Sequence, residues 1–60
     1  MAQPEYLGDG LYVVWDGWQL ELRANDIENP TDRVYLDPST LSNFLFYLKE
    51  HDIVKKEALQ

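Results

Sequence analysis

The chain has no cysteine, a single histidine and only five basic residues among its 60 amino acids. Without cysteine it can form neither a disulfide framework nor a thiolate zinc site. His51 alone cannot build a histidine-rich metal site, so we expect no metal and no cofactor. A domain of this size buries only about 60% of the surface that its unfolded chain exposes. Because disulfides and metals are excluded, association with another chain is the expected source of additional stability.

Long apolar runs are also missing. No stretch approaches the ~20 apolar residues that span a bilayer. The first five residues, Met-Ala-Gln-Pro-Glu, show neither the basic n-region nor the apolar h-region of a signal peptide. The sequence therefore predicts a cytoplasmic protein that does not associate with membranes.

Positive charge is scarce, and the formal net charge is −6. Residues 1–37 carry eight acidic side chains and two arginines, whereas residues 38–60 carry three of each sign. Nucleic-acid binding depends on cation–phosphate contacts, so direct binding of nucleic acid is not expected. The acidic half could instead mimic nucleic acid and face a basic protein surface, or it could simply keep a small protein soluble.

The sequence does contain clear signals for an antiparallel sheet. Asp16-Gly17 lies between two alternating apolar runs, which is the pattern of a two-residue type I′ hairpin turn. This turn predicts that Trp15 pairs with Trp18, Val13 with Leu20 and Leu11 with Leu22, with all six side chains in the core.

Further strands and a helix follow from similar patterns. Residues 25–32 are rich in turn formers, and residues 33–36 alternate again as a third strand. Gly8-Asp9-Gly10 could turn a short fourth strand, residues 5–7, onto the first. Asp37 is the predicted N-cap of a helix that begins at Pro38. Its apolar stripe, at i, i+3, i+4 and i+7, is expected to pack on the tryptophan face of the sheet: Leu41, Phe44, Leu45 and Leu48.

We therefore predict an α+β fold, in which a three-stranded, possibly four-stranded, antiparallel meander packs in two layers on one C-terminal helix. The chain forms a single small domain. It is divided into a flexible N-terminus, the sheet, the helix and a C-terminal extension: residues 1–5, 6–37, 38–51 and 52–60.

No set of catalytic groups can be assembled from the sequence. Gly8-Asp9-Gly10 lacks the spacing of a phosphate loop and precedes a strand rather than a helix. The acidic residues of the 25–32 loop lack the glycine and the distant glutamate of a calcium loop. His51 has no nucleophile placed by sequence to be activated. We expect that the protein is not an enzyme.

The outward face of the sheet is the first candidate for an interaction or ligand site. Tyrosine and arginine are enriched at the anchored centres of protein interfaces, and they could also stack a nucleobase and bind a phosphate. An ordinary solvated face with tyrosines selected for β-propensity is the alternative. The residues of this face are Tyr12, Val14, Arg23, Arg33 and Tyr35.

The helix carries a second candidate surface. A step of 100° per residue places Phe46 about 140° from the apolar stripe, on the solvent side, with Tyr47 on a flank. An exposed phenylalanine needs cover, either from the Ile53-Val54 segment or from a second chain.

The segments YLGDGLYVVWDGWQLEL, RVYLDP and LSNFLFYLKE, in this order, resemble a family of short phage and prophage proteins. The resemblance covers residues 6–50 and rests on a Tyr-Leu-Gly-Asp-Gly opening, an Asp-Gly turn before an aromatic residue and a Leu-Asp-Pro helix start. It implies a phage-encoded accessory protein in the host cytoplasm and carries over no catalytic residue.

These observations together predict a non-enzymatic binding protein, a homo-oligomer that inhibits a component of host defence by protein–protein contact. A second possibility is an oligomeric sponge that sequesters a nucleotide immune signal. A third is an acidic mimic of nucleic acid.

Overall fold

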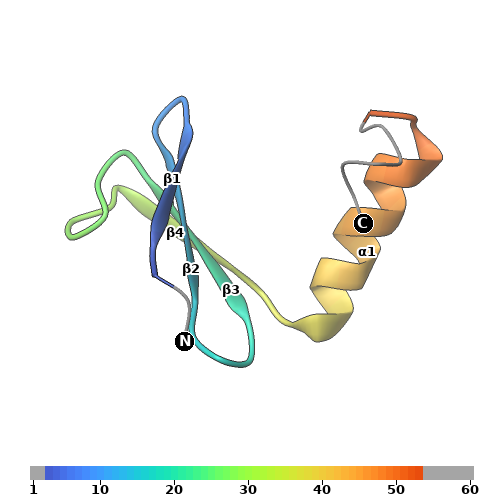
Figure 1. Ribbon diagram of the computed structural model, residues 1–60, viewed down its shortest axis with the longest axis horizontal. Helices are drawn as coiled ribbons and strands as arrows, with labels where there is room; N and C mark the ends of the chain where they lie inside the picture. The colour runs from blue at the N-terminus through green and yellow to red at the C-terminus, as the bar shows by residue number, and fades with distance from the viewer. Residues whose placement is uncertain (1–2, 54–60) are drawn as a thin grey trace.

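The computed structural model describes residues 3–53 of the chain. This part contains four strands followed by one helix: β1 (Glu5–Gly8), β2 (Leu11–Trp15), β3 (Leu20–Ala24), β4 (Asp32–Leu36) and α1 (Pro38–Glu50). The strands form one antiparallel sheet in the order β1-β2-β3-β4, and the helix stands beside it (Figure 1). The predicted α+β meander with a C-terminal helix is confirmed, and the sheet has the fourth strand.

The two-residue type I′ turn lies between β1 and β2. Asp9 and Gly10 adopt φ values of 54° and 82°, as both central residues of this turn must. Gly8 also has a positive φ, 119°, and the pairing register shifts between Tyr6 and Gly8. The Gly-Asp-Gly stretch is therefore the tightest bend of the sheet.

The predicted register of the next hairpin is wrong by two residues. Trp15 pairs with Leu20 rather than with Trp18, so residues 16–19 form a four-residue connection. The Asp16 carboxylate is the physical reason. Its Oδ1 accepts hydrogen bonds from the backbone N–H groups of Trp18, at 2.8 Å, and Gln19, at 2.9 Å. A side chain that satisfies two backbone donors makes the longer turn stable.

A shift of two residues leaves the side of each strand residue unchanged. The register of β2, β3 and β4 therefore defines an apolar sheet face with members from all three strands: Leu11, Val13, Trp15, Leu20, Leu22, Val34 and Leu36. Trp18, in contrast, lies in the connection and is 60% exposed, so the prediction that it enters the core is wrong.

Both ends of α1 carry hydrogen-bonded caps. At the start, Asp37 Oδ1 accepts from the Thr40 backbone N–H at 2.7 Å, as predicted for the N-cap. At the end, Ile53 N–H donates to the Leu48 carbonyl and Asp52 N–H to the Lys49 carbonyl. With Asp52 at φ 57°, this pattern is a Schellman motif that ends the helix at His51.

The helix does not cover the apolar sheet face. Figure 1 shows α1 standing away from the sheet, connected to it through β4. None of the helix residues from Pro38 to Glu50 is buried, and Val34 of the sheet is 54% exposed. Among residues 3–53, Leu36 is the one hydrophobic side chain that is buried. Among residues 3–53, the helix stripe and the apolar sheet face therefore do not close into a shared buried core, and a single residue, Asp37, connects strand and helix.

Candidate interaction surface

The face of the sheet opposite the apolar face gathers the sequence-predicted site residues. One row of cross-strand partners runs from Tyr12 on β2 through Arg23 on β3 to Arg33 on β4. The neighbouring row runs from Val14 through Glu21 to Tyr35. Tyr6 of β1 pairs with Tyr12, so the same face of the sheet continues onto β1. We call these residues the tyrosine–arginine face: Tyr6, Tyr12, Val14, Glu21, Arg23, Arg33 and Tyr35.

Glu21 and Arg23 form the centre of this face. They are two residues apart on β3, so their side chains point to the same side of the sheet. Arg23 Nε donates to Glu21 Oε2 at 2.8 Å, and Arg23 Nη2 donates to Glu21 Oε1 at 3.0 Å. The geometry is bidentate, and the side chains are 23% and 12% exposed for Arg23 and Glu21.

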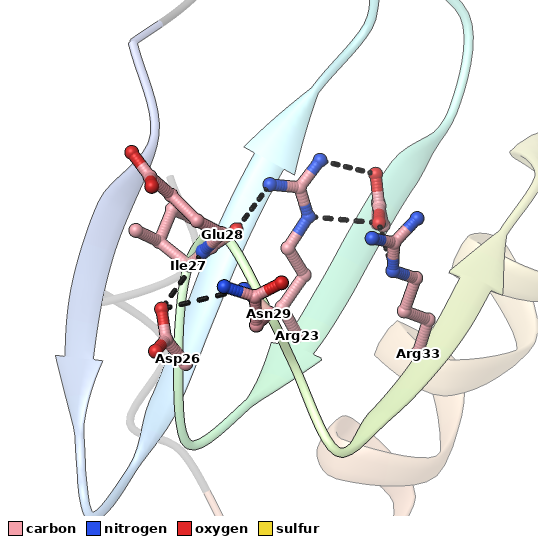
Figure 2. A network of polar contacts seen from close by, with 7 residues as sticks. Arg23, Asp26, Ile27, Glu28, Asn29 and Arg33 are labelled. Atoms are coloured by element: carbon pink, nitrogen blue, oxygen red, sulfur yellow. Dashed lines mark hydrogen bonds and ion pairs between the residues drawn. The ribbon is translucent and has the colours of Figure 1, made fainter.

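Two further groups extend this ion pair (Figure 2). Arg23 Nη1 donates to the backbone carbonyl of Ile27 at 2.6 Å, which ties the β3–β4 loop to the strand. Asp26 shapes the loop from within, since its Oδ1 accepts from the Glu28 backbone N–H at 2.9 Å. On β4, Arg33 Nε lies 3.6 Å from Glu21 Oε2. One carboxylate thus faces two guanidinium groups.

The electrostatics follow from this arrangement. The hydrogen bonds from Arg23 lower the pKa of Glu21, and the positive charges of Arg23 and Arg33 act in the same direction. The same contact raises the pKa of Arg23 above its usual value. Glu21 is therefore ionised at neutral pH, and it neutralises one of the two arginines.

The exposed parts of the face lie on both sides of this pair. Arg33 has a side chain that is 48% exposed, and Tyr35, two residues along β4, is 50% exposed. At the other edge, the ring centroids of Tyr6 and Tyr12 lie 4.9 Å apart, and Tyr6 is 59% exposed. Aromatic rings and one cation are thus presented around a fixed polar centre.

A shallow hollow of about 380 Å³ opens next to Glu21 and Arg23. The extended segment before β1 forms one wall, and the β2–β3 connection forms another. Its lining residues are Gln3, Pro4, Val14, Trp15, Asp16, Glu21 and Arg23. Both carboxylates that line the hollow already accept hydrogen bonds: Glu21 from Arg23, and Asp16 from the backbone N–H groups of Trp18 and Gln19.

The second predicted surface lies on α1. Phe46 is 65% exposed and Tyr47 is 54% exposed, so the predicted exposure of Phe46 is confirmed. The Tyr47 ring stacks at an angle on His51, with centroids 4.4 Å apart. Ile53 is itself 57% exposed, and Val54 lies outside the described residues. A partner role for Phe46 and Tyr47 stays a prediction.

Sequence reasoning did not include Glu21 in the site. The signal was nevertheless present, because strand alternation places Glu21 on the same side as Arg23, and cross-strand neighbours of opposite charge attract. What the sequence did not show was the register of β4 on β3, which pairs Arg23 with Arg33 and brings Arg33 Nε to 3.6 Å from Glu21 Oε2.

Comparison of the chain with protein-family models, with curated proteins and with solved structures finds no match. The resemblance to short phage proteins therefore stays a prediction. Among the described residues 3–53, no cluster of three or more histidine, cysteine or acidic side chains could hold a metal ion. Within the same residues, no helix has the length and apolarity needed to cross a membrane.

Proposed function

We propose that this protein is a non-enzymatic binding protein that contacts a partner protein through the tyrosine–arginine face. The observation that carries the proposal is the contrast within this face. A bidentate Glu21–Arg23 pair fixes its centre, while Arg33 and Tyr35 remain half exposed beside it. Arginine and tyrosine are among the side chains that contribute most of the binding energy in protein interfaces, and a fixed centre lowers the entropy lost on binding.

The same geometry supports protein contact over a nucleotide sponge. A sponge would need both guanidinium groups for phosphate, but three N–H donors of Arg23 are engaged by Glu21 and Ile27. The cluster of one carboxylate and two arginines has a net charge of only +1. A carboxylate at the centre would also repel a phosphate placed between the two arginines.

Nucleic-acid mimicry is supported less well, because the acidic loops lie at both ends of the sheet. In a meander, the β1–β2 turn with Asp9 and the β3–β4 loop with Asp26 share one end, and the β2–β3 connection with Asp16 is at the other. Asp16 and Asp26 also use a carboxylate oxygen to accept backbone hydrogen bonds. A mimic requires a continuous row of negative charge on one surface.

The setting that we propose is a phage accessory protein in the host cytoplasm that inhibits a component of host defence and acts as a homo-oligomer. The supporting sequence feature is the Tyr-Leu-Gly-Asp-Gly opening with the ordered strand and helix motifs of residues 6–50. The supporting structural feature is the exposure of large apolar side chains among residues 3–53, such as Phe46 at 65% and Val34 at 54%.

The test is affinity capture from host cells with the tagged wild-type protein and with the double variant Arg33→Ala/Tyr35→Ala. The captured protein is then purified, and its affinity is measured by calorimetry. Loss of two interface anchors is expected to weaken binding at least about 30-fold, as at interface hot spots. Lys49→Ala, which removes an exposed cation from the helix, is the matched control and is expected to bind like the wild type.

Equal affinity of the double variant and the wild type would refute the proposed face. A rise in melting temperature with a mononucleotide or a cyclic dinucleotide, and no captured protein, would instead favour the sponge. The inhibitor role is tested separately: expression of the protein in a host that restricts a phage is expected to raise the plaque count, and expression of the double variant is not.

A further inference from the structure

Two apolar surfaces of the chain have no cover among the described residues. The apolar sheet face includes Val34, which is 54% exposed. The helix stripe includes Phe44 and Leu45, which are 47% and 40% exposed. A chain of 60 residues has a small core and is marginally stable, so burial of these surfaces would contribute substantially to its stability.

The two surfaces match each other in length and character. A helix of 13 residues is about 20 Å long. Strands of five residues, such as β2, β3 and β4, extend about 17 Å. The helix stripe can therefore lie along the sheet face and cover it from end to end.

The connector prevents this contact from forming within one chain. Asp37 alone links β4 to α1, and its backbone is extended, with φ −72° and ψ 174°. Pro38 keeps the preceding residue out of the helical region, and the Asp37 side chain is held by the Thr40 N–H. The capped, extended connector thus directs the helix away from its own sheet (Figure 1).

We propose that two copies of the chain associate by exchanging α1, so that the helix stripe of each copy packs on the apolar sheet face of the other. A second copy fits because one chain supplies one helix stripe and one sheet face, and a two-fold axis pairs both at once. Short hinges, which cannot let an element fold back without strain, are the connections that favour such exchange.

The area lies at the lower limit for a specific interface. The exposed parts of the side chains on the two surfaces amount to on the order of 500 Å² per chain, of which the half-exposed Phe44 supplies roughly 100 Å². Two chains together bury about 1,000 Å², which reaches the lower bound of a specific interface.

This inference rests on the proposed homo-oligomer and names its interface. It does not involve the tyrosine–arginine face, which lies on the other side of the sheet and is displayed twice in the dimer. The proposed contact with a partner protein and the proposed exchange of the helix can therefore be refuted independently of each other.

The decisive experiment lengthens the hinge. A flexible Gly-Ser segment inserted between Leu36 and Asp37 lets the helix fold back, so we expect a monomer, whereas the wild type has twice the 7.1 kDa mass of one chain. The same segment inserted between Asn29 and Pro30, in the β3–β4 loop, is the matched control and leaves the dimer intact. Mass is measured by sedimentation or light scattering, with circular dichroism as the check on folding.

A second pair of variants tests the helix stripe. Leu45→Glu is expected to abolish the dimer, and Asn43→Glu, on the opposite side of the helix, is expected to keep it. If Leu45→Glu does not fold, the insertion between Leu36 and Asp37 still tests whether the helix is exchanged.

A wild-type protein that is monomeric and cooperatively folded at micromolar concentration would overturn both the exchange and the homo-oligomer. An oligomer whose mass is unchanged by the hinge insertion would overturn the exchange and leave the homo-oligomer standing.

Discussion

The hydroxyl oxygen of Tyr6 accepts a hydrogen bond from the backbone N–H of Gly10 at 3.1 Å. A tyrosine of the exposed face thereby stabilises the turn that joins its own strand to the next. The bond also links the Tyr-Leu-Gly-Asp-Gly opening to a structural role, because its first and last residues contact each other.

Tyr6→Phe is expected to lower the free energy of unfolding by about 0.5–1.5 kcal/mol, the net contribution of a typical hydrogen bond. The ring remains, so the contact with Tyr12 is kept. Urea denaturation followed by circular dichroism measures the change. A variant as stable as the wild type would show that water replaces the hydroxyl without loss.

Gly10→Ala is expected to be more costly, about 1–3 kcal/mol. Gly10 has φ 82°, and a Cβ atom at this position would lie 3.0 Å from Asn25 Oδ1. Asn25→Gly removes that neighbour, so Gly10→Ala should cost less in the Asn25→Gly background, with only the backbone strain left. An equal cost in both backgrounds, measured in a double-mutant cycle, would exclude the steric contribution.

Glu21→Gln tests the central ion pair through its pH dependence. Because folding lowers the pKa of Glu21, its contribution to stability is present above the ordinary pKa that the side chain has in the unfolded chain, and it is lost as the pH falls through the lower folded value. The wild type should therefore lose stability between neutral pH and pH 3 more steeply than Glu21→Gln. Identical slopes would mean that Arg23 does not hold the carboxylate in solution.

Asp37→Ala tests the helix cap. Removal of an N-cap acceptor destabilises a helix by about 1 kcal/mol, whereas Asp37→Ser keeps an acceptor for the Thr40 N–H. We expect Asp37→Ala to lower helicity and the free energy of unfolding, with Asp37→Ser close to the wild type. The hydrogen bond from Thr40 also lowers the pKa of Asp37, so the difference between the aspartate and the serine should shrink in acid.

The sequence predicted on which face of the sheet each strand residue lies, but it did not predict the cross-strand partner of that residue. The Asp16-Gly17 pattern indicates a turn, but a two-residue and a four-residue connection give the same alternation of sides. The choice between them depended on hydrogen bonds from Trp18 and Gln19 to the Asp16 side chain. The type I′ turn lies instead at Asp9-Gly10, which is the same dipeptide as Asp16-Gly17. It gave a weaker hairpin signal because only β2, and not the short β1, shows a long alternating pattern beside it.

The helix was predictable in extent but not in placement. Asp37-Pro38 and the stripe of residues 41–48 marked its start and its apolar side. Periodicity contains no information about the direction in which a helix leaves a strand, because that depends on the backbone angles of one connecting residue. The tyrosine–arginine face was predictable since it requires only alternation. The approach of Arg33 to Glu21 was not, because it depends on the register between β3 and β4.

The edges of the sheet limit how the protein can assemble. β1 is only four residues long, Pro4 precedes it without an N–H to donate, and its register is irregular beside Gly8. β4 ends at Leu36, directly before Asp37-Pro38, and carries two charged residues, Asp32 and Arg33. Short, proline-flanked and charged edges discourage the addition of further strands. Contact between copies is thereby directed to the faces of the sheet, which favours a closed pair over a growing fibre.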